Sequence, residues 1–592
     1  GSENVAVGRE SLEANTTGSA NTALGKSSLG VNTTASNNTA VGYASASSNT
    51  TGAQLAAFGW NALRANTTGS DNTAIGKRAL DANTTASNNT AVGTNALLSN
   101  TTGYGNTAVG FGSLDANTTG YYNVGLGQSA LTDNTTGVDN VAIGVSALGT
   151  NSTASNNVAV GRSALAANTT GSNNTALGYA TLDANTTGIN NTAVGVHALG
   201  VNTTGGYNVA VGLNSLDANT TGGSNVAVGW NTLSANTTAD NNVAVGDNAM
   251  AANTTGSQNT VVGAIAGDSI TTGGNNTIMG FNAGGQFDTG SGNTCFGKEA
   301  GMSIAGSNGQ NNTAVGVNAL RSSHAFFSCT AVGENCLTAS TAHGATAYGS
   351  NTCSSVTSGA ENNGFGYFTL NEATTGSNNA AFGTIALRRA TTGADNTGMG
   401  VGAIQYVTTG SSNTAVGYNA GNALTTGSEC ILIGKEANVS SSGVSELVIG
   451  NAVSGQGNHT GKIYPPGGGG IYQATNGTSF LQTSDERIKK NIVDNNEGLN
   501  KLKDIQVRNF EYRTEDEVTE LPSNLAVKKE GTQLGVIAQE IEKVLPEIIT
   551  TESSGVKTVN SDNLTWYLVN AVKELSTTVD ELKQEIKTLK GE

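Results

Sequence analysis

Charged residues, aromatic residues and proline are all scarce in this chain of 592 residues. Only 12% of the residues are charged and 5% are aromatic, and all four prolines lie after residue 464. No apolar run approaches the ~20 residues that a membrane-spanning helix needs, so membrane insertion is not expected. The chain has 27 Lys and Arg against 43 Asp and Glu, without a basic cluster. This balance argues against nucleic acid as a partner.

Cysteine is also rare, and its pattern excludes the usual cysteine-based sites. The five cysteines are odd in number and have no metal-type spacing, so neither a disulfide framework nor a zinc site is expected. We predict buried, small apolar thiols, and we expect no metal and no cofactor. The five are Cys295, Cys329, Cys336, Cys353 and Cys430.

The charges that are present gather at the C-terminal end. Residues 484–592 hold 15 of the 27 basic residues and 21 of the 43 acidic ones. Such a change in composition predicts at least two domains, with the boundary between Thr483 and Ser484.

A glycine recurs at a constant interval along most of the first part, as at Gly8, Gly25 and Gly42. The unit reads N-[TV]-A-[VLI]-G-x-x-[AS]-L-x-x-N-T-T-[GA]-x-x, as in NTAIGKRALDANTTASN from Asn72. The series is regular as far as Gly297, has one longer interval before Gly316, and continues to Gly450, which makes 27 turns. We call these residues the ladder glycines.

The repeat predicts a mainly β fold. Gly, Asn and Thr are poor helix formers, and a unit of this length suits one coil of a solenoid with two short strands and two turns. In NTAVG, Thr and Val point to one side of the strand, and Asn, Ala and Gly point to the other. We therefore predict a long parallel β-roll over residues 3–450, with Leu filling the interior and Asn stacked in hydrogen-bonded ladders. At roughly 4.8 Å per turn it would be on the order of 130 Å long.

One coil of this roll has a thin core. Each coil buries only a Leu and one or two Val-sized side chains, while ordering the chain costs ~1–2 kcal/mol per residue. We therefore expect self-association to bury a second apolar face. The unit resembles the NxxAxG β-roll repeats in the heads of trimeric autotransporter adhesins, and similar repeats in phage tail fibres. The resemblance implies a parallel, left-handed roll wound as a trimer.

Several features of the repeat favour structural over chemical roles. The Asn-Thr-Thr triplets are formal glycosylation sequons, but we interpret them as polar turns. Stacked Thr residues suggest ice binding only weakly, because they lie beside a turn and not along a flat strand. The single acidic residues at Asp81, Asp115, Asp183 and Asp217 lack a calcium-loop pattern, and we expect a solvated face there.

Residues 264–412 depart from the regular repeat. The Asn-Thr-Thr turn is lost, the register slips before Gly316, and the region holds four of the five Cys and the sequence HAFFSC. Exposed aromatic residues on an irregular loop suit a binding site, so His324, Phe326 and Phe327 are candidate receptor-binding residues. The alternative is a drifted repeat in which Phe326 and Phe327 plug the core, and the sequence favours neither.

The C-terminal part has an ordinary mixed composition. Residues 451–483 contain Pro-Pro and four Gly, which predict a neck that ends the roll. Beyond it we expect a helix in EGLNKLKDI, a strand in QVRNFEYR, and a strand and helix that stop near Pro546. Residues 564–590 form a predicted coiled-coil helix, whose seam residues alternate spacings of four and three. These seam residues are Leu568, Val572, Leu575, Val579, Leu582, Ile586 and Leu589.

Four motifs in order, SDERIKKNI, FEYR, GVIAQEIEKVLPE and LTWYLVNAVKEL, resemble the intramolecular chaperone auto-processing domain of endosialidase-type phage tailspikes and tail fibres. The resemblance covers residues 484–592. It implies a small α+β chaperone domain that aligns three chains and then cuts itself off between Thr483 and Ser484. Ser484 would be the nucleophile and Lys489 its base, which requires the pKa of that amine to fall through burial or a cationic neighbour.

Together these features predict a structural and adhesive homotrimer, a phage tail fibre of the extracellular virion that binds a host-surface receptor or glycan. Its only catalysis would be single-turnover autoproteolysis. One alternative is a glycan-degrading tailspike enzyme, which needs a pair of carboxylates in a cleft. Another is a bacterial cell-surface adhesin, with ice binding as one variant.

Overall fold

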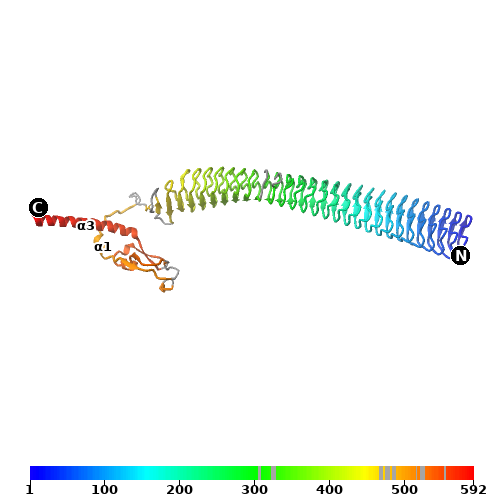
Figure 1. The fold of residues 1–592 in the computed structure, drawn as a ribbon, viewed down its shortest axis with the longest axis horizontal. Coiled ribbons are helices and arrows are strands. Elements are labelled where there is room, and N and C mark those ends of the chain that lie inside the picture. Colours follow the sequence, from blue (N-terminus) through cyan, green and yellow to red (C-terminus); the bar gives the residue numbers. More distant parts are fainter. Residues whose placement is uncertain are drawn as a thin grey trace. The chain divides into compact units, whose positions relative to one another are not determined.

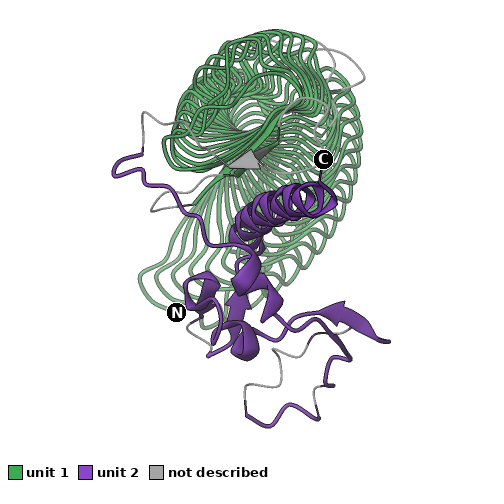
Figure 2. Cartoon of the chain, turned by 90° about the vertical axis from the view of Figure 1, so that its left-hand side faces the viewer, with its two compact units in different colours: residues 1–483 green, residues 484–592 purple. Residues whose placement is uncertain are grey.

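The computed structural model describes residues 1–303, 309–321, 328–465, 471–473, 481–482, 489–514, 516–520, 527, 529–552 and 555–591. The chain divides into two compact units, residues 1–483 and residues 484–592, which are drawn in different colours in Figure 2.

Unit 1 is a long stack of parallel strands, one for each turn of the chain (Figure 1). This confirms the predicted parallel β-solenoid and its repeat. The strands are three residues long, except for the last, which has four. They are β1 Val5–Val7, β2 Thr22–Leu24, β3 Thr39–Val41, β4 Ala56–Phe58, β5 Thr73–Ile75, β6 Thr90–Val92, β7 Thr107–Val109, β8 Val124–Leu126, β9 Val141–Ile143, β10 Val158–Val160, β11 Thr175–Leu177, β12 Thr192–Val194, β13 Val209–Val211, β14 Val226–Val228, β15 Val243–Val245, β16 Thr260–Val262, β17 Thr277–Met279, β18 Thr294–Phe296, β19 Thr313–Val315, β20 Thr330–Val332, β21 Thr346–Tyr348, β22 Asn363–Phe365, β23 Ala380–Phe382, β24 Thr397–Met399, β25 Thr414–Val416, β26 Ile431–Ile433 and β27 Leu447–Gly450.

Equivalent residues of successive repeats pair with each other along the whole stack. Ala74 pairs with Ala91, and Ile75 with Val92. The register survives the longer interval before Gly316, because Thr294 still pairs with Thr313. Changes in repeat length are therefore absorbed by the connections, while the sheet continues unbroken.

The second half of each coil differs from the prediction of a second strand. It is a turn segment in which alternate residues adopt left-handed backbone conformations, such as Arg78 with φ 59° and Leu80 with φ 53°. This conformation is uncommon for residues other than Gly. Each turn is stabilised by hydrogen bonds to the next one, and the Leu80 amide donates to the Ala96 carbonyl at 3.0 Å. The Leu side chain still fills the interior, as predicted, since Leu80 is fully buried.

Asn side chains form two hydrogen-bonded ladders inside the roll. In the first, Asn66 Nδ2 donates to Asn49 Oδ1 of the preceding turn at 2.9 Å and to the Gly69 carbonyl at 2.9 Å. This ladder is built from the Asn of the Asn-Thr-Thr triplets, and Asn66 and Asn83 are fully buried. The sequons are therefore inaccessible to glycosylation in the folded roll, in agreement with their interpretation as turns.

The second ladder lies just before the strands. The backbone amide of Asn123 donates to Asn106 Oδ1 at 2.9 Å, and the Asn123 side chain donates to the Gly137 carbonyl at 2.8 Å. Two of the cysteines take the place of Asn in this ladder. The backbone amide of Cys329 donates to Asn312 Oδ1 at 3.0 Å, so the ladder keeps its backbone contact when the side chain changes.

Residues 264–412 keep the same coil although the sizes of the interior side chains change. The first Asn ladder ends at Asn253, and the equivalent residues of the next two turns are the buried Ile270 and Phe287. The Leu of those turns is replaced by Gly, and a Cβ on Gly284 would lie 2.8 Å from the Phe287 ring. A large side chain at one interior position is thus matched by the loss of one at the other.

The roll ends in a short change of strand direction. β28, Gly461–Tyr464, pairs parallel with β27. β29, Ile471–Gln473, and β30, Leu481–Gln482, then continue the sheet in antiparallel pairs.

Unit 2 contains short elements and one long helix. α1 covers Leu499–Lys503, β31 Arg508–Phe510, β32 Gln533–Gly535, α2 Ala538–Ile541, the 3-10 helix η3 Pro546–Ile548, β33 Ile549–Thr551, β34 Lys557–Val559 and α3 Ser561–Lys590. β31 and β32 are antiparallel, as are β33 and β34. These elements agree with the predicted helix, strand, strand–helix and terminal helix.

The start of α3 lies against the small core of unit 2. Asn560 caps the helix, because its Oδ1 accepts from the Asp562 amide at 3.1 Å. The core consists of Ile541, Leu545 and Ile548, with Leu564 and other partly buried residues packed against it. Within the described ranges, no helix is both long and apolar enough to cross a membrane.

Candidate functional site: assembly surfaces and the cleavage segment

The outer face of the long sheet carries an unbroken row of apolar side chains. The residue before each ladder glycine is Val, Leu, Ile, Met, Phe or Tyr in all 27 turns. None of them is buried in the single chain, and Leu177 is 47% and Met279 43% exposed. We call this the outer apolar row. A soluble chain rarely leaves so long a strip of apolar surface open to water.

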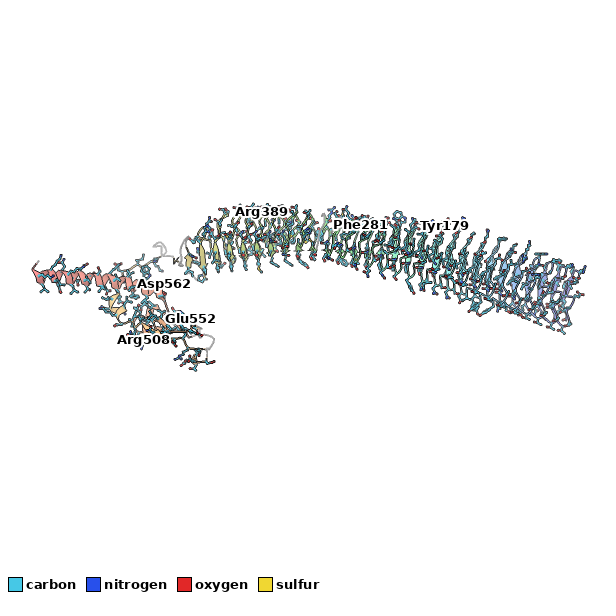
Figure 3. The ribbon with its side chains drawn as sticks, in the orientation of Figure 1. Tyr179, Phe281, Arg389, Arg508, Glu552 and Asp562 are labelled. Atoms are coloured by element: carbon cyan, nitrogen blue, oxygen red, sulfur yellow. The ribbon has the colours of Figure 1, made fainter. Side chains whose placement is uncertain are left out.

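Aromatic residues are most frequent in this row toward the C-terminal end of the irregular region. The rings of Tyr348, Phe365 and Phe382, on three successive turns, stack with centroids 5.1 Å and 4.8 Å apart. A second set of exposed aromatics follows the ladder glycines, and Figure 3 shows two of them, Tyr179 and Phe281, along the same edge of the shaft. Both are about half exposed.

Helix α3 presents a second unpartnered apolar surface. All seven predicted seam residues are exposed, and Leu575 and Leu582 are each 51% exposed. Trp566, near the start of the helix, is 67% exposed. An a/d seam of this kind is buried in proteins by a neighbouring helix.

The predicted cleavage site lies outside the described residues. Thr483 and Ser484 belong to the part that the structure does not describe, so the distance from Ser484 to Lys489 stays untested. Lys489 is described and exposed. A Lys base needs burial or a cationic neighbour, and the single chain does not provide burial at Lys489.

The chain that follows Lys489 is held against helix α3. Asn570 Nδ2 donates to the Asn495 carbonyl at 2.6 Å, and the Leu499 amide donates to the Glu574 carboxylate at 2.9 Å. A Cβ on Gly498 would lie 2.3 Å from the Ala571 amide nitrogen, so this glycine is needed for the close approach. Residues 495–499 are therefore anchored to the helix that carries the seam.

Glu540, in the GVIAQE motif, has a structural contact. Its carboxylate accepts hydrogen bonds from Arg508 Nη2 at 2.9 Å and Nε at 3.1 Å. These bonds hold the pKa of Glu540 below its usual value. They join α2 to β31, so Glu540 has a structural role in unit 2.

The candidate receptor-binding residues His324, Phe326 and Phe327 also lie outside the described residues, so neither interpretation of that loop is decided. The cysteines nearby are buried and form no disulfide within the described residues, in line with the predicted buried thiols. Burial raises the pKa of Cys336 to about 11, which leaves its thiol protonated and unreactive at neutral pH.

The acidic residues of the turn segments are less solvated than predicted. Asp81 is buried, and its carboxylate pairs with Arg64 Nε at 2.6 Å and Arg78 Nε at 3.0 Å. Burial raises the pKa of Asp115, Asp183 and Asp217. The turn segment folds these short side chains toward the backbone, which explains why the expectation of a solvated face was wrong for Asp81.

Asp183 and Asp217 approach each other over Gly200. A Cβ on that glycine would lie 2.8 Å from Asp217 Oδ1 and 3.7 Å from Asp183 Oδ1. The positive charge of His197 lowers the pKa of both carboxyls, against the larger effect of burial. These are two neighbouring carboxyls of the kind that the alternative enzymatic function would need. No cluster of three or more His, Cys, Asp or Glu able to hold a metal occurs within the described part of the chain.

Sequence reasoning missed one group of charged and aromatic residues. Phe368, Glu372, Arg388, Arg389 and Tyr406 come together on three successive turns of the irregular region. The available signal was the sixth residue after each ladder glycine, which is small in most other turns and large in these three.

Comparison with known families places a chaperone domain at the C-terminal end. Residues 484–550 match the family described as the chaperone of endosialidase. This agrees with the resemblance found in the four sequence motifs.

Two curated relatives are long tail fibre proteins. The chain is 30% identical over 129 residues to long tail fiber protein Gp37 of Enterobacteria phage Ox2, a match that covers 21% of this chain and 46% of the relative. It is 28% identical over 134 residues to Gp37 of Enterobacteria phage M1, covering 22% of this chain and 48% of the relative. The chain therefore matches slightly less than half the length of each relative.

Proposed function

We propose that this chain is the shaft of a homotrimeric phage tail fibre, assembled by its C-terminal domain and carried on the outside of the virion. The observation that carries the proposal is the outer apolar row, which continues through all 27 turns without a partner in the single chain. Three copies that face one another along this row would remove it from water, at a gain of roughly 25 cal/mol per Å². The similarity to tail fibre proteins supports the same arrangement.

Alignment is the difficulty in such an assembly. Successive turns present nearly identical side chains, so two chains shifted by one turn lose little contact. A C-terminal chaperone resolves this problem if it brings three chains together in register before the shaft winds. The exposed seam of α3 supplies the contact, and the match to the chaperone of endosialidase supports this role.

Cleavage at Ser484 would make the assembly irreversible. The Ser484 hydroxyl would lose its proton to the Lys489 amine and attack the Thr483 carbonyl carbon. The C–N bond then breaks, the proton passes to the leaving Ser484 nitrogen, and Thr483 is held as an ester. Water hydrolyses the ester and frees the Thr483 carboxylate. Because Lys489 is exposed in the single chain, we infer that a neighbouring chain desolvates it in the trimer.

A denaturing gel of freshly expressed protein tests the cleavage. We expect the wild-type chain to release residues 484–592, a fragment that includes the whole second unit. Ser484→Ala and Lys489→Ala should remain intact. Lys490→Ala is the matched control, since Lys490 is also exposed, and it should be cleaved normally. An intact wild-type chain, or cleavage in Ser484→Ala, would refute the autoproteolytic part of the proposal.

The same fibre would attach to the host. Relatives named as long tail fibre proteins support a host-contacting role, and we propose that the shaft recognises a surface receptor or glycan of the host cell. Purified fibre should compete with the phage for adsorption to host cells. Undiminished adsorption at saturating fibre would contradict the attachment role.

A further inference from the structure

Three successive turns of the shaft carry large side chains where most turns carry small ones. The sixth residue after a ladder glycine is usually Ala, Ser, Thr or Val, but Glu372, Arg389 and Tyr406 occupy this position in consecutive turns. Arg388 precedes Arg389, and Phe368 lies on the first of the three turns. Figure 3 shows Arg389 at the outer edge of the shaft. These five residues are called the arginine–aromatic cluster.

Each arginine of the cluster lies over an aromatic ring. The guanidinium carbon of Arg388 is 5.7 Å from the ring centroid of Phe368, and that of Arg389 is 5.3 Å from the centroid of Tyr406. Tyr367 packs edge-on against Phe368 at 4.4 Å and is itself 54% exposed. Stacking on a ring fixes the plane of a guanidinium, which orders its donors before a ligand arrives.

The positive charge of the cluster is only partly neutralised. Glu372 forms an ion pair with each arginine, with Oε1 3.2 Å from Arg388 Nε and Oε2 3.5 Å from Arg389 Nε. The Arg388 N–H is not directed at that oxygen, and in the described structure Nε makes no hydrogen bond. One carboxylate cannot saturate two guanidiniums with five N–H donors each. Arg388 Nε is buried, so the donors that a ligand can reach are the other guanidinium N–H groups of the two arginines, whose side chains are 35% and 48% exposed.

We propose that the arginine–aromatic cluster binds an acidic glycan. The carboxylate or phosphate of the sugar would take the free guanidinium donors in a bidentate pair, while the sugar ring packs on the exposed face of Tyr406 or Tyr367. The three turns span about 10 Å along the shaft, so the site fits an oligosaccharide segment. This inference rests on the proposed attachment function and gives it a location and a ligand class.

Binding to immobilised polysaccharides tests the site in the assembled full chain. The probes are polygalacturonate, which carries carboxylates, a phosphomannan, which carries phosphates, and neutral dextran. We expect binding to at least one acidic polymer and none to dextran, with affinity that falls as salt rises. In the double variant Arg389→Ala with Tyr406→Ala, the affinity for that polymer should fall by on the order of tenfold or more. It should still fold, because other turns carry Ala at this position.

Arg162→Ala is the matched control, since Arg162 is an exposed arginine on a regular turn, and its binding should be unchanged. No binding to either acidic polymer, equal binding to dextran, or full binding by the double variant would each overturn the proposal. The acidic polymer that binds identifies the anionic group. The native mass of the same samples tests the fibre separately. A trimer that binds none of the three polymers refutes this binding site alone. A monomer refutes the proposed trimeric assembly.

Discussion

Gly144 shows how little space separates neighbouring turns of the shaft. A Cβ at this residue would lie 2.5 Å from the Gly161 carbonyl oxygen, and the φ of 136° is strained for any other residue. At Gly149 the nearest atom is 3.3 Å away. We predict that Gly144→Ala lowers the thermal stability of the full chain sharply, while Gly149→Ala changes it little. Melting followed by circular dichroism checks this, and equal effects of the two variants would be inconsistent with it.

Asp115 gives the shaft a defined dependence on pH. Burial raises its pKa, although the nearby charge of Arg78 opposes the shift, and its Oδ1 has no hydrogen-bond partner among the described residues. The folded chain therefore holds this proton more tightly than the unfolded chain. Ionising Asp115 therefore lowers the stability of the folded chain. This loss of stability is absent below the unfolded pKa of about 3.9 and grows as pH rises toward the folded pKa.

We predict that Asp115→Asn stabilises the fibre at pH 7 by less than about 1 kcal/mol, because partial solvent exposure screens the effect. The gain should vanish near pH 3. Asp71→Asn, at an exposed acid, is the control and should show no such difference. Melting temperatures at the two pH values measure it, and a gain that is the same at both would exclude the proposed cause.

At the scale of single residues, the sequence predicted contacts that repeat and missed those that occur once. The Asn ladders and the buried Leu followed from the constant period, because each turn places the same residue at the same position, whereas the buried Cys followed from their number and spacing. The pairing of Asp81 with Arg78 of its own turn and Arg64 of the preceding turn depends on how the turn folds its side chains. The arginine–aromatic cluster was missed for the same reason.

At the scale of elements, the strands and the terminal helix were predictable, and the second half of the coil was not. A Leu at φ 53° is unusual, and nothing in a single repeat indicates it. Hydrogen bonds between adjacent turns, such as that from Leu80 to Ala96, are what stabilise this conformation. They exist only after the chain has stacked on itself, so a local pattern suggests a strand instead.

Helix α3 offers a direct test of the assembly contact. Leu575→Lys with Leu582→Lys places charges on the exposed seam, where a neighbouring helix would bury them at a high cost. We predict that this double variant no longer yields trimers. Thr577→Lys, on an exposed side of the same helix away from the seam, should assemble normally. Light scattering distinguishes the two outcomes, and a trimeric double variant would show that the seam is not the contact.

At the scale of the whole molecule, the proposed function gives the two units complementary parts of one task. The shaft has a long apolar row that needs partners but contains little information on their register. The C-terminal unit has its own small core and an exposed seam, and it matches a chaperone family over residues 484–550. In the proposed fibre the C-terminal unit aligns the chains and the shaft displays the binding surface, which would explain why a monotonous repeat is followed by an ordinary mixed sequence.

The native mass of the uncleaved chain tests the central claim most directly. Ser484→Ala should keep both units joined, and sedimentation equilibrium then measures the assembled species without a fitted shape. We predict three times the chain mass of 59.2 kDa, unchanged on dilution into the nanomolar range. A species of 59.2 kDa that remains folded would contradict the trimeric fibre, because the outer apolar row would then be stable in water without a partner.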